Sequence, residues 1–177
     1  SLVGHRQSLI KSKIAEKYDF EGELAVVIGR GGRHIISESA LSHVAGYTCF
    51  LDGTLRDYQK HSFTAGKNFD SSGACGPWLV LEHNIVDPQS LQIITRVNGK
   101  VMQNANTSEM IFSIANLIQY ISSFTHLEAG DIIATGTPSG VGSGRTPSVW
   151  LASGDCVEVD IEKVGVLSNI VKSESKI

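Results

Sequence analysis

The sequence predicts an α+β fold that is mainly β, with many short strands and few helices. Segments with apolar residues at alternate positions, or in short apolar runs, outnumber the segments with helical spacing. The expected strands are not separated by regular helical crossovers, which argues against a doubly wound parallel sheet. No internal repeat, low-complexity tract or proline-rich linker divides the 177 residues. We therefore expect residues 1–177 to form a single domain.

The clearest expected strand runs from Asp19 to Gly29. Apolar side chains at alternate positions of this stretch share one face, and two glutamates lie on the other face. Further strands are expected at residues 47–51, 78–82, 91–97, 132–135, 157–161 and 166–171. The dipeptide Asn98-Gly99 predicts a tight hairpin turn after one of them.

Two helices are expected. Ser37 can cap a short helix that continues to His43 and is closed by Gly46. The clearer helix runs from about residue 108 to 122, and Asn106 with Glu109 resembles a capping box at its start. Its apolar residues recur at helical spacing, namely Ile111, Ile114, Leu117, Ile118 and Ile121.

Composition and charge exclude several function classes. Hydrophobic residues make up 41% of the chain and charged residues 19%, which is typical of a folded globular protein. The formal net charge is only −3 and the Lys and Arg residues are scattered, so no nucleic-acid partner is expected. The longest apolar runs, such as Leu24 to Ile28, are too short to span a bilayer, so no membrane association is expected.

Three cysteines, Cys49, Cys75 and Cys156, form no CxxC pair, and an odd number cannot all pair within the chain. Free thiols in a reducing, cytoplasmic compartment are the expected state. Cys75 lies in a glycine-rich stretch and is a candidate nucleophile. No histidine lies close to it in sequence, which argues against that role.

The most specific chemical signal is a set of acidic residues. Residues i and i+2 of a strand point the same way, so Glu21 and Glu23 direct two carboxylates at one place. The alternative is a solvated strand edge, but the strand continues into an apolar run, which favours burial. Asp52 adds a third carboxylate directly after the apolar segment 47–51. Three oxygen ligands suit Mg²⁺, Mn²⁺ or Ca²⁺ better than zinc.

The six histidines show no HxH or HExxH spacing, so a histidine–zinc site is not expected. A second polar cluster contains Arg56, Gln59 and Lys67. A lysine beside a cation and a carbonyl group can stabilise a developing oxyanion. On spacing alone, however, ordinary charges on a solvated loop are the simpler interpretation of this cluster.

A third signal is the stretch DIIATGTPSGVG at residues 131–142. A strand that enters such a loop exposes backbone N–H groups and the Thr137 hydroxyl, which could hold a carboxylate. The stretch is not a P-loop, because no Gly-Lys-Ser/Thr follows. The glycines near residue 30 do not form GxGxxG either, because His34 takes the last position.

Five ordered segments together resemble the fumarylacetoacetate hydrolase family over most of residues 19–142. The resemblance rests on DFEGELAVVIGR, GYTCFLDGTLRDYQ, GKNFD, GACGPW, and NGKVMQNANTSEMIFSIANLIQYIS with LEAGDIIATGTPSGVG. It implies the family's β-rich fold and a homodimer. It also implies a Mg²⁺ or Mn²⁺ ion held by Glu21, Glu23 and Asp52.

The same resemblance implies that Arg56, Gln59, Lys67 and Thr137 line the substrate pocket. The implied reaction is metal-dependent cleavage of a carbon–carbon bond in a 2,4-dioxo acid of the acylpyruvate or fumarylpyruvate type, as in the catabolism of aromatic compounds. In that reaction Lys67 and Gln59 would stabilise the oxyanion beside Arg56. The alternatives are decarboxylation or isomerisation of a related oxo or hydroxy-dienedioic acid, and a non-catalytic protein that binds metal and small acids.

Two departures from the family pattern matter. Family members commonly read ND-x-S-A-R-D where this chain has LDGTLRD at residues 51–57, which keeps the ligand and the Arg-Asp pair but changes their surroundings. Many members also carry a His and a Glu on a mobile N-terminal lid, where they activate water. His5 lies too late to match that motif, so either the base lies in a segment outside residues 1–177, or the protein lacks this pair.

Overall fold

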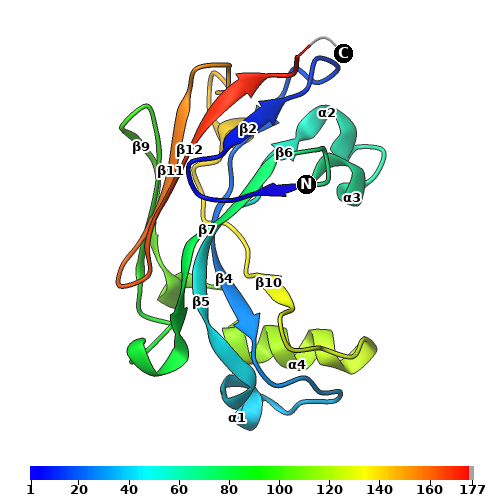
Figure 1. The fold of residues 1–177 in the computed structure, drawn as a ribbon, viewed down its shortest axis with the longest axis vertical. Helices are drawn as coiled ribbons and strands as arrows, with labels where there is room; N and C mark the ends of the chain where they lie inside the picture. The colour runs from blue at the N-terminus through cyan, green and yellow to red at the C-terminus, as the bar shows by residue number, and fades with distance from the viewer. Residues whose placement is uncertain (176–177) are drawn as a thin grey trace.

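Two five-stranded sheets dominate the computed structural model, which describes residues 1–175 (Figure 1). In the first sheet all neighbours are antiparallel except β1 and β7, which are parallel. Its strands, in spatial order, are β1 (Leu2–Val3), β7 (Gly73–Leu81), β5 (Val44–Leu51), β4 (Gly22–Ile28) and β10 (Ile132–Ala134).

The second sheet is also antiparallel, apart from its edge strand β2, which runs parallel to β12. Its spatial order is β2 (Ser8–Lys11), β12 (Gly165–Ser173), β11 (Cys156–Ile161), β8 (Gln92–Val97) and β9 (Lys100–Asn106). A short ribbon of β3 (Tyr18–Asp19) and β6 (Thr54–Leu55) completes the strands. The predicted β-rich α+β fold class is confirmed.

The helices are few and mostly short. The α-helices are α1 (Ser37–Ala40), α2 (Arg56–Gln59), α3 (Phe63–Gly66) and α4 (Ile114–Phe124), and the 3₁₀ helices are η1 (Leu41–His43), η2 (Glu82–Asn84), η3 (Thr107–Glu109) and η4 (Gly142–Gly144). Within residues 1–175, none of these helices has the length and apolar character needed to cross a membrane.

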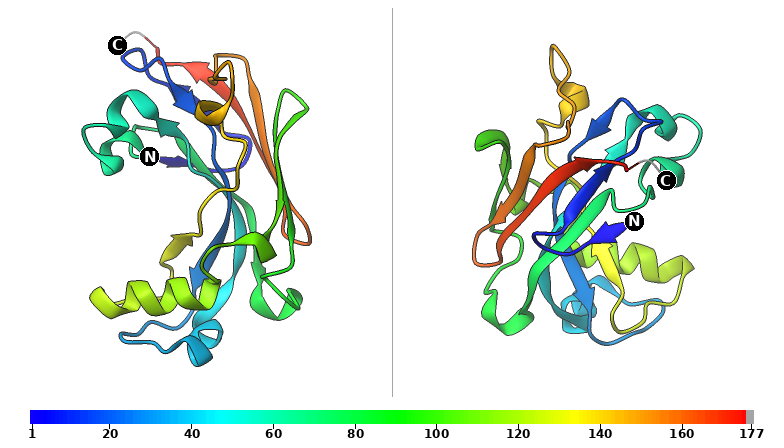
Figure 2. Two further views of the ribbon diagram at one scale, coloured as in Figure 1. Left: turned by 180° about the vertical axis from the view of Figure 1, so that it is seen from behind. Right: turned by 45° about the horizontal axis from the view of Figure 1, so that its top comes forward.

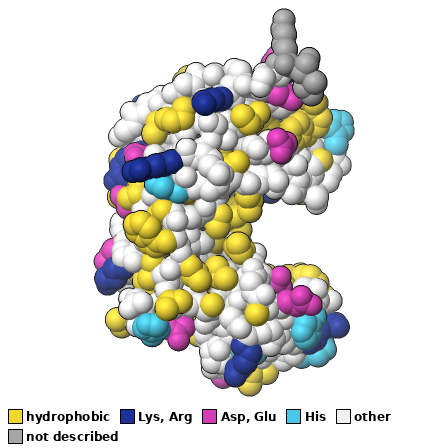
Figure 3. Space-filling model, viewed as in Figure 1, with side chains coloured by type: hydrophobic (Ala, Val, Ile, Leu, Met, Phe, Trp, Pro, Cys, Tyr) yellow, Lys and Arg dark blue, Asp and Glu magenta, His cyan; other side chains and the backbone are white. Residues whose placement is uncertain are grey.

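The long strands β4, β5 and β7 form the narrow middle of the molecule. Helices α2 and α3 lie beyond one end of this middle and α4 with α1 beyond the other, while the second sheet lies along the opposite side (Figures 1 and 2). The space-filling view shows a surface that is hollowed between the two groups of helices (Figure 3). The first residues of β4 and the end of β5 therefore lie close to the α2 and α3 side of this hollow.

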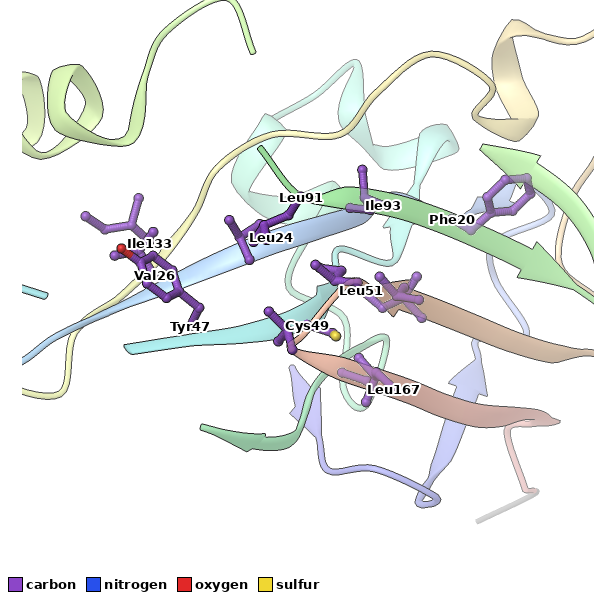
Figure 4. Close-up of a cluster of buried hydrophobic side chains, with 14 of the residues drawn as sticks. Phe20, Leu24, Val26, Tyr47, Cys49, Leu51, Leu91, Ile93, Ile133 and Leu167 are labelled. Atoms are coloured by element: carbon purple, nitrogen blue, oxygen red, sulfur yellow. The ribbon is translucent and has the colours of Figure 1, made fainter. Parts of the chain in front are cut away.

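The core lies between the two sheets. Leu24 and Val26 of β4 and Cys49 and Leu51 of β5 are buried there, facing side chains such as Leu167 from β12 (Figure 4). Burial of these apolar side chains is the main stabilising term of such a fold. The opposite face of β4 is buried as well, so both faces of its first five residues are removed from solvent.

The hairpin turn at Asn98-Gly99 is confirmed. Val97 pairs with Lys100, and the two residues between them have positive φ angles of 52° and 76°. Asparagine and glycine are the residues that tolerate this backbone conformation best.

The predicted start of the helix over residues 108–122 was wrong. The capping box of Asn106 and Glu109 is present, but it caps the 3₁₀ helix η3, and α4 begins only at Ile114 with Ser113 as its N-cap. The apolar spacing runs through both pieces, so it could not reveal the break between them. The strand expected at residues 78–82 begins earlier, at Gly73, and the strands β1, β2 and β6 and the helices α2 and α3 were not predicted.

The two sheets approach each other closely at Gly22, the first residue of β4. A Cβ atom there would lie 2.0 Å from Thr95 Oγ1 and 3.3 Å from Val159 Cγ1, both on the second sheet. Because real Cβ atoms do not approach other atoms this closely, only glycine fits at this position without a shift of Thr95.

We therefore expect Gly22→Ala to lower the free energy of unfolding by about 1–3 kcal/mol, the usual cost of overpacking a core. Thr95→Ala should relieve the clash. The double variant should therefore lose less free energy of unfolding than the sum of the losses in the two single variants. Urea unfolding of all four proteins measures this coupling. Additive losses would show that the contact does not exist.

Candidate metal centre

Three carboxylates from separate segments meet at the start of β4. Glu23 belongs to β4, Glu21 lies just before it, and Asp52 follows the last residue of β5. The backbone N–H of Asp52 donates to the carbonyl oxygen of Glu21 over 2.9 Å, which fixes the two segments side by side. One carboxylate oxygen from each of the three side chains lies within 4.8 Å of the others. The structure thus brings together the three residues that the sequence predicts as cation ligands.

Two cationic side chains lie against this cluster. The Nζ of Lys67, directly after α3, donates to Glu21 Oε2 over 2.7 Å and makes a short contact with Asp52 Oδ2. Arg56, the first residue of α2, donates from one terminal nitrogen to Glu21 Oε1 over 2.5 Å. Its other terminal nitrogen donates to Gln59 Oε1 over 3.0 Å. Arg56, Gln59 and Lys67 therefore surround the carboxylates and do not lie on a solvated loop.

The glycine-rich loop after β10 closes the other side of the cluster. The backbone N–H of Gly136 donates to Glu23 Oε2 over 2.8 Å. The Thr137 hydroxyl, predicted to hold a substrate carboxylate, donates to the carbonyl oxygen of Gly22 over 3.0 Å and accepts from Gln103 Nε2 over 2.7 Å. Its hydrogen is thus used to fasten the loop to β4.

Two buried residues of the site were missed by the sequence analysis. Gln103 of β9 accepts from the N–H of Gly22 over 3.0 Å and donates to the loop, so it joins the second sheet to the site. Asp19 is fully buried and accepts from Arg56 Nε over 2.9 Å. A signal for Asp19 did exist, because it precedes Glu21 and Glu23 at the same two-residue spacing.

The electrostatics of the cluster favour an added cation. Burial, reinforced by the charges of Asp52 and Glu21, raises the pKa of Glu23 to about 7, although the Gly136 N–H and Lys67 oppose the rise. Burial also raises the pKa of Asp52, against the opposing effect of Lys67. Burial alone would lower the pKa of Lys67, but its hydrogen bonds to Asp52 and Glu21 outweigh this and raise it. Lys67 is therefore protonated at neutral pH.

The donor chemistry fits a hard divalent cation. The cluster offers carboxylate oxygens and contains no histidine or cysteine donor, and such oxygens suit Mg²⁺, Mn²⁺ or Ca²⁺. The four carboxylates of Asp19, Glu21, Glu23 and Asp52 face two cations, Arg56 and Lys67. When all four are ionised, a charge of −2 is left, which one divalent cation would neutralise.

Comparison with known proteins assigns the chain to a family. The profile described as the fumarylacetoacetate (FAA) hydrolase C-terminal domain matches residues 1–172. The chain belongs to the fumarylacetoacetate hydrolase family. The resemblance inferred from the ordered motifs is thereby confirmed.

Family relatives carry the names of different enzymes. The oxaloacetate tautomerase YisK of Bacillus subtilis (strain 168) is 48% identical over 173 residues, which are 96% of this chain and 57% of that protein. The solved fumarylacetoacetate hydrolase of the psychrophilic Exiguobacterium antarcticum is 41% identical with a TM-score of 0.94, over 98% of this chain and 64% of that one. The 2-hydroxyhepta-2,4-diene-1,7-dioate isomerase of Mycobacterium marinum is 38% identical with a TM-score of 0.90, over 99% of this chain and 66% of that one.

This member of the family spans less than two thirds of the length of each of these three relatives. The names of the relatives do not agree on hydrolysis, so the predicted hydrolase is not established by them.

The remaining nucleophile candidate does not belong to the site. Cys75 lies within β7 as a free, half-buried thiol, and burial raises its pKa, so the reactive thiolate is disfavoured. His5 accepts a hydrogen bond at Nδ1 from the N–H of Ser168 over 3.0 Å, which fastens the N-terminal segment to β12. Cys75 and His5 therefore belong to the packed body of the fold and not to the carboxylate cluster.

The raised pKa of Glu23 predicts a stability that depends on pH. Because the folded state holds this proton more tightly than the unfolded state, the free energy of unfolding should fall as pH rises from about 4.5 to 7 and stay low above that. The fall has an upper limit of about 3.5 kcal/mol, at about 1.4 kcal/mol per pKa unit.

Urea unfolding of the metal-free protein in EDTA between pH 4.5 and 8 measures this fall. Glu23→Gln keeps an acceptor for the Gly136 N–H but has no charge, so its curve should lose the part of the slope due to Glu23. Asp52, whose pKa is also raised, contributes a slope of the same sign, and this contribution should remain. Identical slopes in the two proteins would contradict the assignment.

Proposed function

We propose that the chain carries the catalytic site of a divalent-cation-dependent enzyme that interconverts the keto and enol forms of a small 2-oxo dicarboxylic acid of the oxaloacetate class. This assignment makes Glu21, Glu23 and Asp52 the cation ligands, with Mg²⁺ or Mn²⁺ as the ion. It corresponds to the isomerase alternative of the sequence analysis. The relative named as an oxaloacetate tautomerase, at 48% identity, supports the choice of substrate class.

The observation that carries the proposal is the position of Lys67. Its protonated ammonium group lies between the carboxylates of Glu21 and Asp52. The Lys67 side chain is nevertheless 28% exposed. A cation held by the three carboxylates would act as a Lewis acid toward the oxygens of the oxo acid. The Lys67 ammonium would then lie beside the oxygen on which negative charge develops during enolisation.

The chemistry of the step is simple. A C–H bond next to the oxo group breaks and its proton passes to a general base other than Lys67. The electron pair of that bond forms a new C=C bond, and the oxo oxygen gains a proton. Lys67 can stabilise the charge on that oxygen and can supply the proton, because its partners keep it in the ammonium form. Arg56 and Gln59 are bound to each other beside Glu21, where they can orient one carboxylate of a diacid.

Carbon–carbon bond hydrolysis of a 2,4-dioxo acid remains the second candidate. The specific observation in its favour is the solved fumarylacetoacetate hydrolase with a TM-score of 0.94 to this chain. In both reactions an enolate forms and negative charge develops on the oxo oxygen. The residues that stabilise this charge would therefore be shared. They differ in whether water attacks a second carbonyl.

Parallel assays separate the two reactions. Purified protein with Mg²⁺ is given oxaloacetate, an acylpyruvate and a hydroxy-dienedioic acid, and the decay of enol absorbance and the release of pyruvate are followed. We expect fast tautomerisation of oxaloacetate without net consumption. Pyruvate release from the acylpyruvate at a higher kcat/KM would favour hydrolysis. Metal binding without turnover of any of the three acids would favour a non-catalytic binding protein.

Removing the Lys67 ammonium should separate catalysis from metal binding. We expect Lys67→Met to lower kcat by about two to three orders of magnitude, the usual cost of losing one charge-stabilising group. The variant should bind Mn²⁺ at least as tightly as the parent protein, because Lys67 competes with the metal for Glu21 and Asp52.

Calorimetric titration with Mn²⁺ and the tautomerisation assay, run on the same samples, test both halves of this prediction. Lys172→Met, an exposed lysine on β12, is the matched control. An unchanged kcat, or loss of Mn²⁺ binding, in Lys67→Met would contradict the role.

We also propose that the protein is a homodimer in the cytoplasm. Trp78, Leu79 and Leu81 of β7 are 62%, 42% and 47% exposed, and hydrophobic side chains gather along the narrow middle of the molecule (Figure 3). Apolar side chains on one exposed strand are typical of a surface that is covered in an assembly.

Leu79 and Leu81 lie two residues apart on β7 and so share one face of the sheet. We expect Leu81→Asp to halve the mass measured by light scattering, from dimer to monomer, without a change in circular dichroism. Val86→Asp, at a 95% exposed position outside the strands, is the control. A monomeric parent protein would exclude the dimer.

A further inference from the structure

The carboxylate of Asp19 is the most completely bonded acidic group in the site region. Its Oδ1 accepts from the N–H groups of Phe20 and Gly142, over 2.9 and 2.7 Å. Its Oδ2 accepts from the N–H of Ser143 over 3.0 Å and from Arg56 Nε over 2.9 Å. With no exposed surface, this side chain meets four donors with its four lone pairs.

These bonds fix the guanidinium group of Arg56. Asp19 holds Nε, so the planar group has one allowed orientation, and its terminal nitrogens are directed at Glu21 Oε1 and Gln59 Oε1. Arg56 thereby holds Glu21 through Oε1, and Oε2 of Glu21 faces Lys67. A ligand carboxylate held in this way loses less freedom when a cation binds.

Asp19 also anchors one end of the glycine-rich loop. Gly142 and Ser143 donate to Asp19 at one end, and Gly136 donates to Glu23 at the other end. Space at Gly142 is tight, since a Cβ there would lie 2.7 Å from Asp19 Oδ1 and 1.9 Å from the carbonyl oxygen of Val149. The loop is thus bound at both ends to acidic side chains of one short stretch of chain.

We infer that Asp19 is a positioning residue of the site: it orients Arg56, and through Arg56 it orients Glu21 for cation binding. This inference rests on the proposed function only in taking Glu21 as a cation ligand. The carboxylate is required because all four partners are donors. An asparagine of the same shape would turn its own NH₂ group toward two N–H donors and lose two acceptor contacts.

The test measures cation binding and the state of Arg56, not turnover. In Asp19→Asn, we expect the Kd for Mn²⁺ by calorimetry to rise about 10- to 100-fold, the usual effect of losing a partner that orients a ligand. We also expect the ¹⁵N–¹H signal of Arg56 Nε, slow to exchange in the parent protein, to exchange rapidly. Asp160→Asn is the matched control, because its partner Arg96 forms a half-exposed pair on the second sheet.

Non-additivity shows whether Asp19 acts through Arg56. Arg56→Met should raise the Kd for Mn²⁺ by a similar factor, because Arg56 fixes Glu21 through Oε1, whereas Lys67 occupies Oε2 and competes with the metal there. Adding Asp19→Asn to Arg56→Met should raise the Kd little further. An unchanged Kd in a folded Asp19→Asn protein, or two fully additive effects, would overturn the inference. Asp19→Ser is the second variant, and failure of both Asp19 variants to fold would assign Asp19 to folding and also overturn it.

The outcomes separate this inference from the proposed function. If the parent protein binds Mn²⁺ and Asp19→Asn weakens that binding, but no oxo acid is turned over, the inference stands and the proposed reaction fails. If oxaloacetate is turned over with the same Kd for Mn²⁺ in both proteins, the reaction stands and the inference fails.

Discussion

The constraint on which the site depends is the repulsion among buried carboxylates. Glu23 is 3% exposed and Glu21 is 7% exposed, and Asp52 shares the same small space. Like charges at this distance in a medium of low polarity destabilise one another strongly. The fold offsets the repulsion with Arg56 on one side and Lys67 on the other, and a divalent cation would complete the balance.

The rest of the architecture holds these charges in place. Strand β4 is buried on both faces, so it cannot relax toward solvent when its glutamates repel. Its backbone is bound to β5 along its length, to the loop after β10, and to the second sheet through Gln103. The charge-balancing residues follow β5 within sixteen positions. Arg56 is the first residue of α2, and Lys67 comes directly after α3. The ligands thus lie in or next to the rigid strands β4 and β5, and the cations lie in or next to short helices.

Much of this could be predicted from sequence because it depends on local geometry. The alternation of Glu21 and Glu23 in an apolar strand, and Asn98-Gly99 as a hairpin turn, follow from the period of a strand and from backbone preference. Asp19 and Gln103 were missed because their roles depend on Gly142 and Gly22, which are 123 and 81 positions away. The Thr137 hydroxyl was predicted to hold a substrate carboxylate, which stays a prediction. Its bonds to Gly22 and to Gln103 of β9 could not be predicted, because no spacing rule reveals them.

The close approach at Gly22 has a consequence for protein engineering. The residue between the two glutamates is restricted by a threonine on the opposite sheet, not by the chemistry of the cation. Transplanting the Glu-x-Glu pair to another scaffold would therefore require a partner sheet with a matching recess at this position. Conversely, a library that varies residue 22 alone samples the fit between the sheets, and changes in metal affinity found there would report on the spacing of the two layers.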